Sequence, residues 1–501
     1  MSTGPRFGVV GMGATGVGVF VELVQSLIAG GDPSGASIHL FEPRDELGAG
    51  VAYSTPEDCH LLNMRAVTMS LRPDDPMHFL RWMRERPDRP ESEEYVPRRL
   101  FAAYLREHLD AAVRAARAAR IRVHVHHAVV SDCREENGLV HVIAGVDHFA
   151  LDYAVLCLGD LPSTDYLEFC KLPTYVHSVW QGSGLRQIPP DARVGVIGTS
   201  LTAVDVLLSL GEQGHRGPVT AVARRRSLPK VQGPRMSPRL RHITRDNLAA
   251  LTGGWSRRLD LDDVVRLFRA ELEDALGPVD WAAVFTEAHK PFLDALRHDV
   301  ALAEDGQTAW YYILDATSEI IPELWDWMTE QARAEFLENH LSIWAMFRHC
   351  VPLRNGRRLL AMAEAGRFDA LSGLTSVTHD PDRDEFELAG VHGEPYRRRV
   401  DYLLNATGTG FALERSDSSL LQNMLMRGEI RPHRLGGVDV EFDTMRVIRP
   451  DGSASERTFY VGPLTRGVHF YTNSLETNLT NSRRATAAMT AHLVHRRPDN
   501  R

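Results

Sequence analysis

Cysteine is scarce in this sequence, and the few cysteines are badly spaced for redox or metal chemistry. The 501 residues include five, at positions 59, 133, 157, 170 and 350, with no C-x-x-C pair and no Cys/His spacing typical of a metal site. A disulfide reductase needs a closely spaced dithiol, so this spacing argues against that class. We expect reduced thiols and a cytoplasmic protein.

Long apolar runs and an excess of positive charge are also missing. No run of about 18 apolar residues is present, which argues against a membrane span. The apolar stretch Phe7–Val21 contains five glycines and no basic leader, so we do not expect a signal peptide. The formal net charge of −9 does not favour a nucleic-acid partner.

A glycine-rich motif near the N-terminus predicts a dinucleotide site. The letters G-M-G-A-T-G at Gly11–Gly16 follow a strand-like run and open an apolar helical pattern, an arrangement that brings a pyrophosphate to a helix N-terminus. Glu42 ends the next predicted strand, where a carboxylate can hold ribose hydroxyls. A purely structural turn is the less favoured alternative. The predicted contacts are Gly11, Gly13, Ala14, Thr15, Gly16 and Glu42.

A second strand, turn and helix begins near Arg193, with the letters G-T-S-L-T-A at Gly198–Ala203. Serine replaces the middle glycine but keeps a small residue there. The following strand ends in Arg224-Arg225-Arg226, and arginine there favours NADPH over NADH because it suits a 2′-phosphate. A solvated basic loop remains the alternative. The predicted contacts are Gly198, Thr199, Ser200, Leu201, Arg224 and Arg225.

Two similar stretches, Tyr153–Gly159 and Asp401–Gly408, each run from a strand into a small-residue turn, and the second contributes Thr407 and Gly408 as predicted cofactor contacts. The order of motifs predicts an α/β fold with two Rossmann-like dinucleotide-binding domains and a helical insert. We expect an FAD domain over residues 1–185 and 366–501. The NADPH domain is expected over 186–365, with its insert at about 235–365.

Several further motifs carry a resemblance to a known family. They include F-E-P at Phe41–Pro43, G-A-G-V-A-Y at Gly48–Tyr53, H-L-L-N-M at His60–Met64 and G-P-L-T-R-G at Gly462–Gly467. With the two glycine motifs, they make the chain resemble bacterial FAD/NAD(P)-binding flavoproteins related to class B flavin monooxygenases and amino-acid N-hydroxylases. That group includes the aspartate N-hydroxylases that make nitrosuccinate. The resemblance implies FAD in the first site and a nicotinamide cofactor in the second.

The activity that the resemblance implies is hydroxylation of a nitrogen through a hydroperoxyflavin, with NADPH and dioxygen as co-substrates. The expected substrate is a small amine or amino acid, with an acidic amino acid such as aspartate as the leading hypothesis. One alternative is an NAD(P)H-dependent flavin oxidoreductase that passes electrons to another acceptor. Another is a nucleotide-sensing flavoprotein without turnover. The oligomeric state stays open, with a homo-oligomer among the options.

Four residues are singled out beyond the glycine motifs. The resemblance places Asn63 near the flavin ring and Arg466 at the flavin's pyrophosphate or pyrimidine edge. Arg348 and His349 follow a long helical pattern, and a guanidinium there can clamp a substrate carboxylate. We therefore predict Asn63, Arg348 and His349 as catalytic residues. The structural alternatives are a turn residue for Asn63, a helix-end arginine and histidine for Arg348 and His349, and a surface ion pair for Arg466.

Overall fold

The chain divides into two compact units in the computed structural model, which describes residues 4–31, 33–87, 89–90, 94–180, 184–225, 228–234, 236–286 and 290–495. Unit 1 comprises Met1–Pro56, Met64–Leu161 and Gly410–Arg501. Unit 2 comprises Glu57–Asn63 and Pro162–Thr409. Each unit is built around its own parallel β-sheet.

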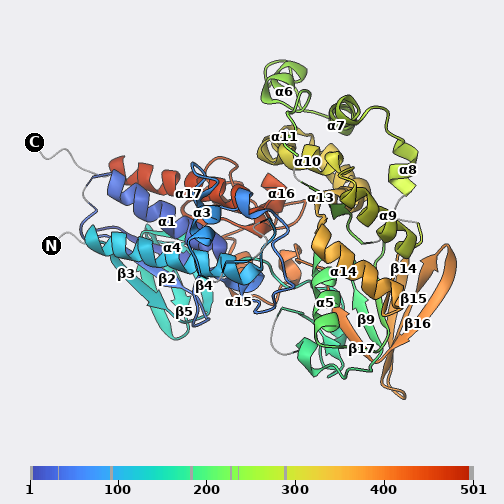
Figure 1. The fold of residues 1–501 in the computed structure, drawn as a ribbon. Coiled ribbons are helices and arrows are strands. Elements are labelled where there is room, and N and C mark those ends of the chain that lie inside the picture. The colour runs from blue at the N-terminus through green and yellow to red at the C-terminus, as the bar shows by residue number, and fades with distance from the viewer. Residues whose placement is uncertain are drawn as a thin grey trace, which may run out of the picture. The chain divides into compact units, whose positions relative to one another are not determined.

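Unit 1 has a six-stranded sheet in the order β18-β19-β7-β1-β2-β3, and all neighbours pair in parallel except β18 with β19. Its strands are β1 (Arg6–Val10), β2 (Ser37–Phe41), β3 (Arg122–His126), β7 (Tyr153–Leu156), β18 (Arg446–Ile448) and β19 (Ala454–Tyr460). Helix α1 (Ala14–Ala29) packs beside α4 (Arg98–Ala118) and α17 (Leu475–His495) (Figure 1). The near-continuous apolar strands β1 and β7 are buried, as parallel strands covered on both faces require.

Smaller elements complete unit 1. An antiparallel meander consists of β4 (Val130–Glu136), β5 (Leu139–Ala144) and β6 (Asp147–Leu151). The short helices are α2 (Gly50–Tyr53), α3 (His78–Arg84), α15 (Ser419–Arg427) and α16 (Arg466–His469). Helix α15 begins with a Ser418 cap and ends at Gly428, which adopts the left-handed conformation that commonly stops a helix.

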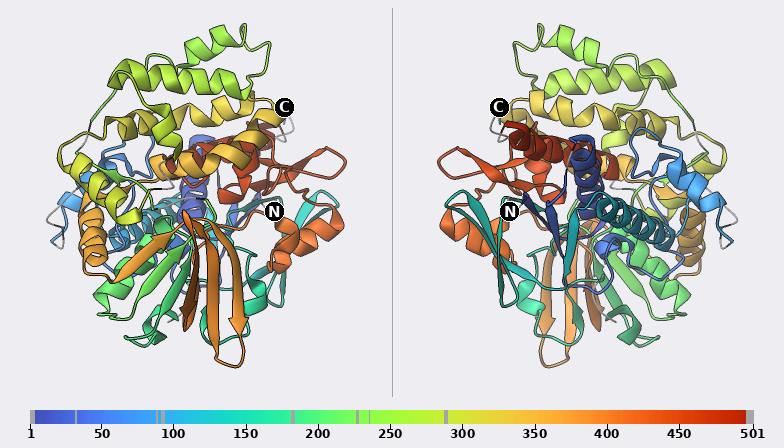
Figure 2. Two further views of the ribbon diagram at one scale, coloured as in Figure 1. Left: turned by 90° about the vertical axis from the view of Figure 1, so that its right-hand side faces the viewer. Right: turned by 90° about the vertical axis from the view of Figure 1, so that its left-hand side faces the viewer.

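Unit 2 has a five-stranded, fully parallel sheet in the order β13-β10-β9-β17-β8. The strands are β8 (Tyr175–Val176), β9 (Val194–Ile197), β10 (Val219–Val222), β13 (Phe368–Leu371) and β17 (Tyr402–Asn405). Helices α5 (Leu201–Glu212) and α14 (Leu353–Glu364) pack together. A three-stranded meander of β14 (Leu374–Asp380), β15 (Glu385–His392) and β16 (Glu394–Val400) is seen as the long orange strands in Figure 2.

The predicted α/β fold with two Rossmann-like units and a helical insert is confirmed. The insert helices are α6 (Arg245–Leu251), α7 (Leu261–Leu276), α8 (Trp281–Thr286), α9 (Phe292–Glu304), α10 (Ala309–Ala316), α11 (Ile321–Trp327), α12 (Glu330–Glu335) and α13 (Leu341–Arg348). Proline at the start of α11 separates it from α10. A π-helical turn at Phe336–His340 joins α12 to α13. Strands β11 (Val231–Gln232) and β12 (Val351–Pro352) close the base of the insert in parallel.

The compact units differ in extent from the residue ranges expected from the sequence. Unit 2 reaches from Pro162 to Thr409, beyond the expected 186–365, because β8 and β17 both pair into its sheet and the β14–β16 meander precedes β17. It also includes the short segment Glu57–Asn63 from the N-terminal part of the chain. In the described residues, none of the helices combines the length and apolar character that a membrane crossing needs.

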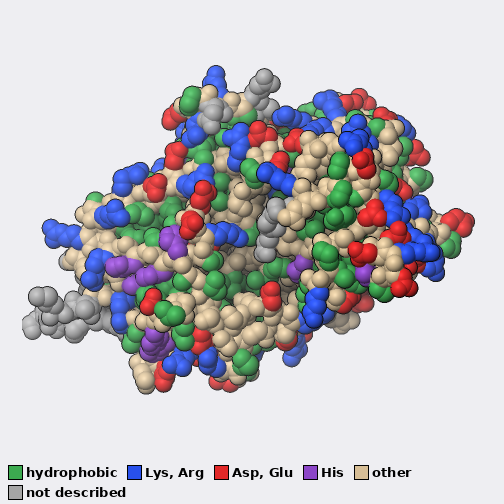
Figure 3. Space-filling model, turned by 90° about the horizontal axis from the view of Figure 1, so that it is seen from below, with side chains coloured by type: hydrophobic (Ala, Val, Ile, Leu, Met, Phe, Trp, Pro, Cys, Tyr) green, Lys and Arg blue, Asp and Glu red, His purple; other side chains and the backbone are tan. Residues whose placement is uncertain are grey.

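Three histidines stack where β2 and β3 pair in unit 1. The His39 ring lies 4.8 Å from the His124 ring and 5.2 Å from the His126 ring, and His39 Nδ1 is 3.0 Å from His126 Nε2. Burial, followed by the neighbouring imidazoles and by Arg6 and Arg122, lowers the pKa of His39 to about 4. Histidine side chains also gather on the molecular face shown in Figure 3, among interspersed acidic and basic groups.

This cluster predicts a loss of stability in mild acid. Because His39 titrates at about 4 in the folded protein against 6.5 ordinarily, the unfolded chain binds more protons between these values. The free energy of unfolding should therefore be highest above about pH 6.5 and fall as the pH drops toward 4. Chemical denaturation at several pH values measures this, and His39→Phe should flatten the dependence. An equal slope in His39→Phe, or an equal flattening in a variant of the exposed His298, would contradict the assignment.

Candidate functional site

The first glycine motif lies at the carboxyl edge of the unit 1 sheet, between β1 and β7. Strand order reverses there, since β2 and β3 follow on one side of β1 and β7 lies on the other. Gly11 has a φ of +91°, and a Cβ at this position would lie 2.3 Å from the carbonyl oxygen of Cys157. A Cβ on Gly16 would lie 1.9 Å from the carbonyl oxygen of Gly11. Dinucleotides bind open α/β sheets at such a switch point.

Helix α1 begins within the motif, and no acidic side chain in its first turn offsets the positive end of the helix dipole. Gly13 is the N-cap of α1 and provides no side-chain hydrogen bond. Glu42, 6% exposed, accepts a hydrogen bond from the Met12 amide at 2.9 Å through Oε2. A helix N-terminus with this composition attracts a pyrophosphate, and Glu42 stands at the end of β2 where a ribose hydroxyl would donate to it.

Arg466 provides a cation in the same unit. Its guanidinium lies 3.6 Å from the Phe411 ring centroid, and its buried Nε has no hydrogen-bond partner. Among the described residues, no carboxylate forms an ion pair with it, and burial lowers its pKa to about 10. A Cβ on Gly462, which begins the Arg466 loop, would lie 4.0 Å from Thr15 Cγ2 in the glycine motif. A half-buried cation without a carboxylate partner among the described residues is partly desolvated, so this position fits an anionic ligand.

The second glycine motif repeats this arrangement in unit 2. Gly198 follows β9 with a φ of +121°, and a Cβ there would lie 2.3 Å from the carbonyl oxygen of Ala406 after β17. The N-cap of α5 is Ser200, whose side chain makes no capping bond, and no acid stands in the first turn. Thr407 is held by Asn405, whose Oδ1 accepts from its amide at 3.1 Å and its hydroxyl at 2.6 Å. The turn between β9 and α5, beside the end of β17, therefore has the geometry expected of a phosphate-binding turn.

The two arginines after β10 lie in unit 2 as well. The side chain of Arg224 is 73% exposed and has only a distant carboxylate, Asp165, at 3.7 Å. Arg225 is exposed and donates to the carbonyl oxygen of Glu338 in the π-helical turn of the insert. Arg226 lies outside the described residues. Because both side chains are exposed, they are accessible to a 2′-phosphate.

Asn63 and His349 are brought together by a residue that the sequence analysis missed. Gln232, 1% exposed, donates through Nε2 to the carbonyl oxygen of Asn63 at 3.1 Å and to that of Cys350 at 3.4 Å. Cys350 follows His349 directly, and both Asn63 and His349 are half-buried. The strap Glu57–Asn63 and the end of the insert therefore meet at one buried amide.

The structure places Arg348, the predicted substrate clamp, in a buried ion pair inside the insert. It is 2% exposed, and its Nη2 lies 2.8 Å from Asp315 Oδ1 and 2.7 Å from Ser318 Oγ. The positive charge is therefore neutralised inside the insert, where it ties α13 to the end of α10. No local pattern marks Asp315 in the sequence, because it stands on α10 and α11 and α12 separate it from Arg348 at the end of α13.

A stability measurement separates the two roles of Arg348. Arg348→Ala should destabilise the protein by about 3 kcal/mol, the lower end for loss of one partner of a buried pair, because Asp315 is partly exposed. Thermal and denaturant unfolding measure the change. The double variant Arg348→Met with Asp315→Leu should recover most of the loss, since no charge is then left without a partner. If Arg348→Ala left stability unchanged and weakened substrate binding, the result would support Arg348 as the residue that binds a substrate carboxylate.

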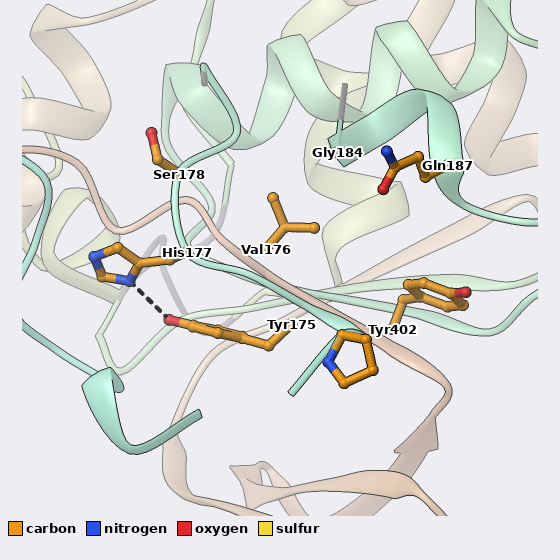
Figure 4. Close-up of a pocket in the computed structure, with 8 residues that line it drawn as sticks. Tyr175, Val176, His177, Ser178, Gly184, Gln187 and Tyr402 are labelled. Atoms are coloured by element: carbon orange, nitrogen blue, oxygen red, sulfur yellow. Dashed lines mark hydrogen bonds between the residues drawn. The ribbon is translucent and has the colours of Figure 1, made fainter. Parts of the chain in front are cut away.

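A small pocket of about 280 Å³ lies at the edge strand β8 of unit 2, and Figure 4 shows Tyr175, His177, Gln187 and Tyr402 around it. Tyr175 Oη and His177 Nδ1 are 3.3 Å apart, and Tyr175 also bonds to the Asn405 side chain that holds Thr407. The pocket lies below the usual range for a ligand site and contains none of the predicted residues. In the part of the chain that the structure describes, no cluster of three or more His, Cys, Asp or Glu residues could hold a metal.

Comparison with known proteins agrees with the geometry of unit 1. A family model described as FAD-NAD(P)-binding matches residues 8–161. Residues 8–161 are an FAD-NAD(P)-binding domain. They contain Gly11, Glu42 and the strands β1, β2 and β7, which together form the first switch point.

Two relatives extend the likeness. The uncharacterized protein YdhS of Escherichia coli (strain K12) is 24% identical over 425 residues, which cover 72% of this chain and 76% of that protein. The nitrosuccinic acid synthase npaA of Aspergillus oryzae is 30% identical over 126 residues, which cover 24% of this chain and only 19% of that protein.

Two solved structures show the same fold as this chain. L-lysine 6-monooxygenase from Pseudomonas syringae has a TM-score of 0.57 at 15% identity, with 98% of this chain and 99% of that chain covered. The bacillithiol disulfide reductase of Staphylococcus aureus has a TM-score of 0.51 at 13% identity, with 98% and 99% covered. The fold is therefore shared by a monooxygenase and a reductase, and it does not choose between them.

Proposed function

We propose that this protein is an FAD-dependent, NADPH-reduced monooxygenase that hydroxylates the nitrogen of an amine or amino acid. The observation that carries the proposal is a pair of strand–glycine–helix turns, at Gly11 and Gly198, whose helices begin without an acidic residue in the first turn. Arg466, half-buried and without a carboxylate partner among the described residues, supports an anionic ligand in unit 1. The FAD-NAD(P)-binding domain over residues 8–161 supports FAD at the first glycine motif. The fold shared with L-lysine 6-monooxygenase supports the reaction class.

The residues of unit 1 fit FAD. Gly11, Gly13 and Gly16 leave room for the backbone to approach a pyrophosphate, with Ala14 and Thr15 in the first turn of α1, and Glu42 would hold the ribose. Arg466 would meet the flavin's phosphate or pyrimidine edge. When bound, FAD supplies the capacity to accept hydride from NADPH and to activate dioxygen.

The residues of unit 2 fit NADPH. Gly198, Thr199, Ser200 and Leu201 open α5 without a capping side chain or an acid, so its N-terminus can receive the pyrophosphate. Thr407 and Gly408 border the same turn. Arg224 and Arg225 would hold the 2′-phosphate, because arginine pairs with phosphate in a bidentate manner.

Asn63 and His349 would act on the substrate. An amine attacks an electrophilic oxygen only when it is unprotonated, so a group that takes its proton near neutral pH has a direct use. His349 would serve as that group through its imidazole, and its half-buried position excludes part of the solvent. Asn63 would orient the amine through its side-chain amide, with its main chain held by Gln232.

The substrate is proposed to be a carboxylate-bearing amine, with aspartate as the leading candidate. Support comes from the similarity to the fungal nitrosuccinic acid synthase, over 24% of this chain. The proposed partner of the substrate carboxylate is Arg348, which would share its charge with Asp315, 2.8 Å from its guanidinium.

An NAD(P)H-dependent flavin oxidoreductase is the competing function, because the reductase from Staphylococcus aureus shares the fold. Product analysis by mass spectrometry separates the two. The purified protein is incubated with NADPH, ¹⁸O₂ and a panel that contains aspartate, lysine, ornithine and simple amines. We expect one amine to gain an ¹⁸O-labelled hydroxyl group. NADPH oxidation that requires an added quinone and labels no amine would establish the reductase instead.

Removing the Arg466 charge should weaken FAD binding without unfolding the protein. Arg466→Met loses the partner of an anionic ligand but also removes a half-buried charge that has no carboxylate partner among the described residues, so the FAD-free melting temperature should stay equal or rise. Flavin absorbance per protein and melting curves with and without added FAD measure both effects.

Arg65→Met is the matched control, because Arg65 is buried but paired with Glu94 at 3.0 Å. It should lower stability and leave the FAD affinity of the folded fraction unchanged. Full FAD occupancy in Arg466→Met would show that Arg466 does not contact the cofactor.

The two arginines after β10 should determine the preference for NADPH. Replacing Arg224 and Arg225 together by Ala should raise the KM for NADPH about tenfold or more and change the KM for NADH little, since only NADPH carries a 2′-phosphate. Arg216→Ala, which removes an exposed arginine paired with Asp191 in the same unit, provides the control. Equal changes for both cofactors would place the 2′-phosphate contact elsewhere.

A further inference from the structure

Gln232 is a buried polar side chain of unit 2 that bonds to two separate segments of the chain. It lies on β11, is 1% exposed, and directs one amide nitrogen at two main-chain carbonyls that are far apart in sequence. One belongs to Asn63 at the end of the strap Glu57–Asn63, and the other to Cys350 just after His349. The Gln232 amide therefore links the end of the strap to the segment that follows His349.

The strap is also bonded to other segments of unit 2. His60, 4% exposed, places Nε2 2.8 Å from Ser209 Oγ and 3.3 Å from the carbonyl oxygen of Asp205, both on the nicotinamide-site helix α5. Asn355 donates through Nδ2 to the carbonyl oxygen of Cys59 at 3.1 Å. These contacts hold the middle of the strap, and Gln232 holds its end.

The residues before and after Gln232 on the chain are bonded to the helical insert. Lys230, two residues earlier, forms a buried ion pair with Asp299 at 2.8 Å, and its amide donates to the carbonyl oxygen of Met346 in α13. Gly233, one residue later, is bonded through its amide to Thr308 Oγ1 at 3.0 Å and through its carbonyl to Tyr312 Oη at 2.5 Å. Lys230 and Gly233 are both bonded to the insert, so the backbone on either side of Gln232 is anchored there. The Gln232 side chain reaches the Asn63 carbonyl from that anchored position.

We propose that Gln232 is a positioning residue that sets Asn63 beside His349 and so determines whether oxygen reaches the substrate. The proposal rests on the function proposed above. In the coupled reaction, NADPH, a proton, dioxygen and the amine give NADP⁺, water and the hydroxylamine. When the amine is misplaced, NADPH, a proton and dioxygen give NADP⁺ and hydrogen peroxide. Loss of the Gln232 amide should shift the balance toward hydrogen peroxide.

The test compares Gln232→Met with Gln422→Met. Methionine has a similar shape but cannot donate, and Gln422 in unit 1 also donates from one Nε2 to two main-chain carbonyls, those of Leu413 and Ser416, at 2.8 and 2.9 Å. Both variants therefore lose the same kind of contact. The measurements are hydrogen–deuterium exchange of a peptide that covers the strap, FAD content, and hydrogen peroxide formed per NADPH oxidised.

We expect Gln232→Met to raise strap exchange about tenfold and to raise the share of hydrogen peroxide, with FAD content and the rate of flavin reduction by NADPH unchanged. Gln422→Met should leave strap exchange and coupling as in the unaltered protein. Identical behaviour of the two variants overturns the proposal.

Two further measurements keep the outcomes separate. If Gln232→Met does not fold, Asn355→Leu provides a second test, because it removes the hydrogen bond to Cys59 in the strap. This variant should change strap exchange and coupling in the same direction as Gln232→Met. Normal values of both would count against the proposal. If the unaltered protein makes no hydroxylated amine at all, the proposed function fails. The exchange comparison then still decides whether Gln232 fixes the strap.

Discussion

The turn from sheet to helix in each unit depends on a glycine that has no space for a side chain. A Cβ on Gly11 or on Gly198 would lie 2.3 Å from a carbonyl oxygen of the adjacent strand end, at Cys157 and Ala406 respectively. Because only hydrogen fits there, the chain can turn sharply into α1 or α5 beside that strand end. The N-terminus of each helix then lies at the carboxyl edge of its sheet, where Glu42 follows β2 in unit 1 and Thr407 follows β17 in unit 2.

The elements around these glycines were predictable because their patterns are local. The apolar run Ser37–Phe41 predicts a strand, and β2 has these bounds. The helical pattern from about Pro97 to Arg120 predicts a helix, and α4 covers Arg98–Ala118. The β14–β16 meander was not predicted. In β16 only Tyr396 and Val400 are buried, and Arg397, Arg398 and Arg399 lie between them, so the strand does not show the alternation of apolar and polar residues that identifies a half-buried strand.

Residues whose setting depends on distant partners could not be read from the sequence. Gln232 bonds to Asn63 and Cys350 across separations of 169 and 118 residues, and no short motif marks such contacts. Arg348 attracted attention because it stands beside a histidine at a helix end. Its role depends on Asp315, which only the packing of α13 against α10 brings within 2.8 Å. The sites of the glycine motifs are encoded locally, whereas the substrate side is encoded by tertiary contacts.

Two arginines with different surroundings show how folding and binding place different demands on a charge. Arg348 is 2% exposed, and Asp315 beside it offsets the desolvation of its charge within the folded protein. Arg466 is half-buried, its guanidinium lies over the ring of Phe411, and no carboxylate in the described residues forms an ion pair with it. A partly desolvated charge without such a partner lowers stability unless a ligand supplies the anion. Arg466 therefore favours an anionic ligand in unit 1, and this argument does not depend on the glycine motif.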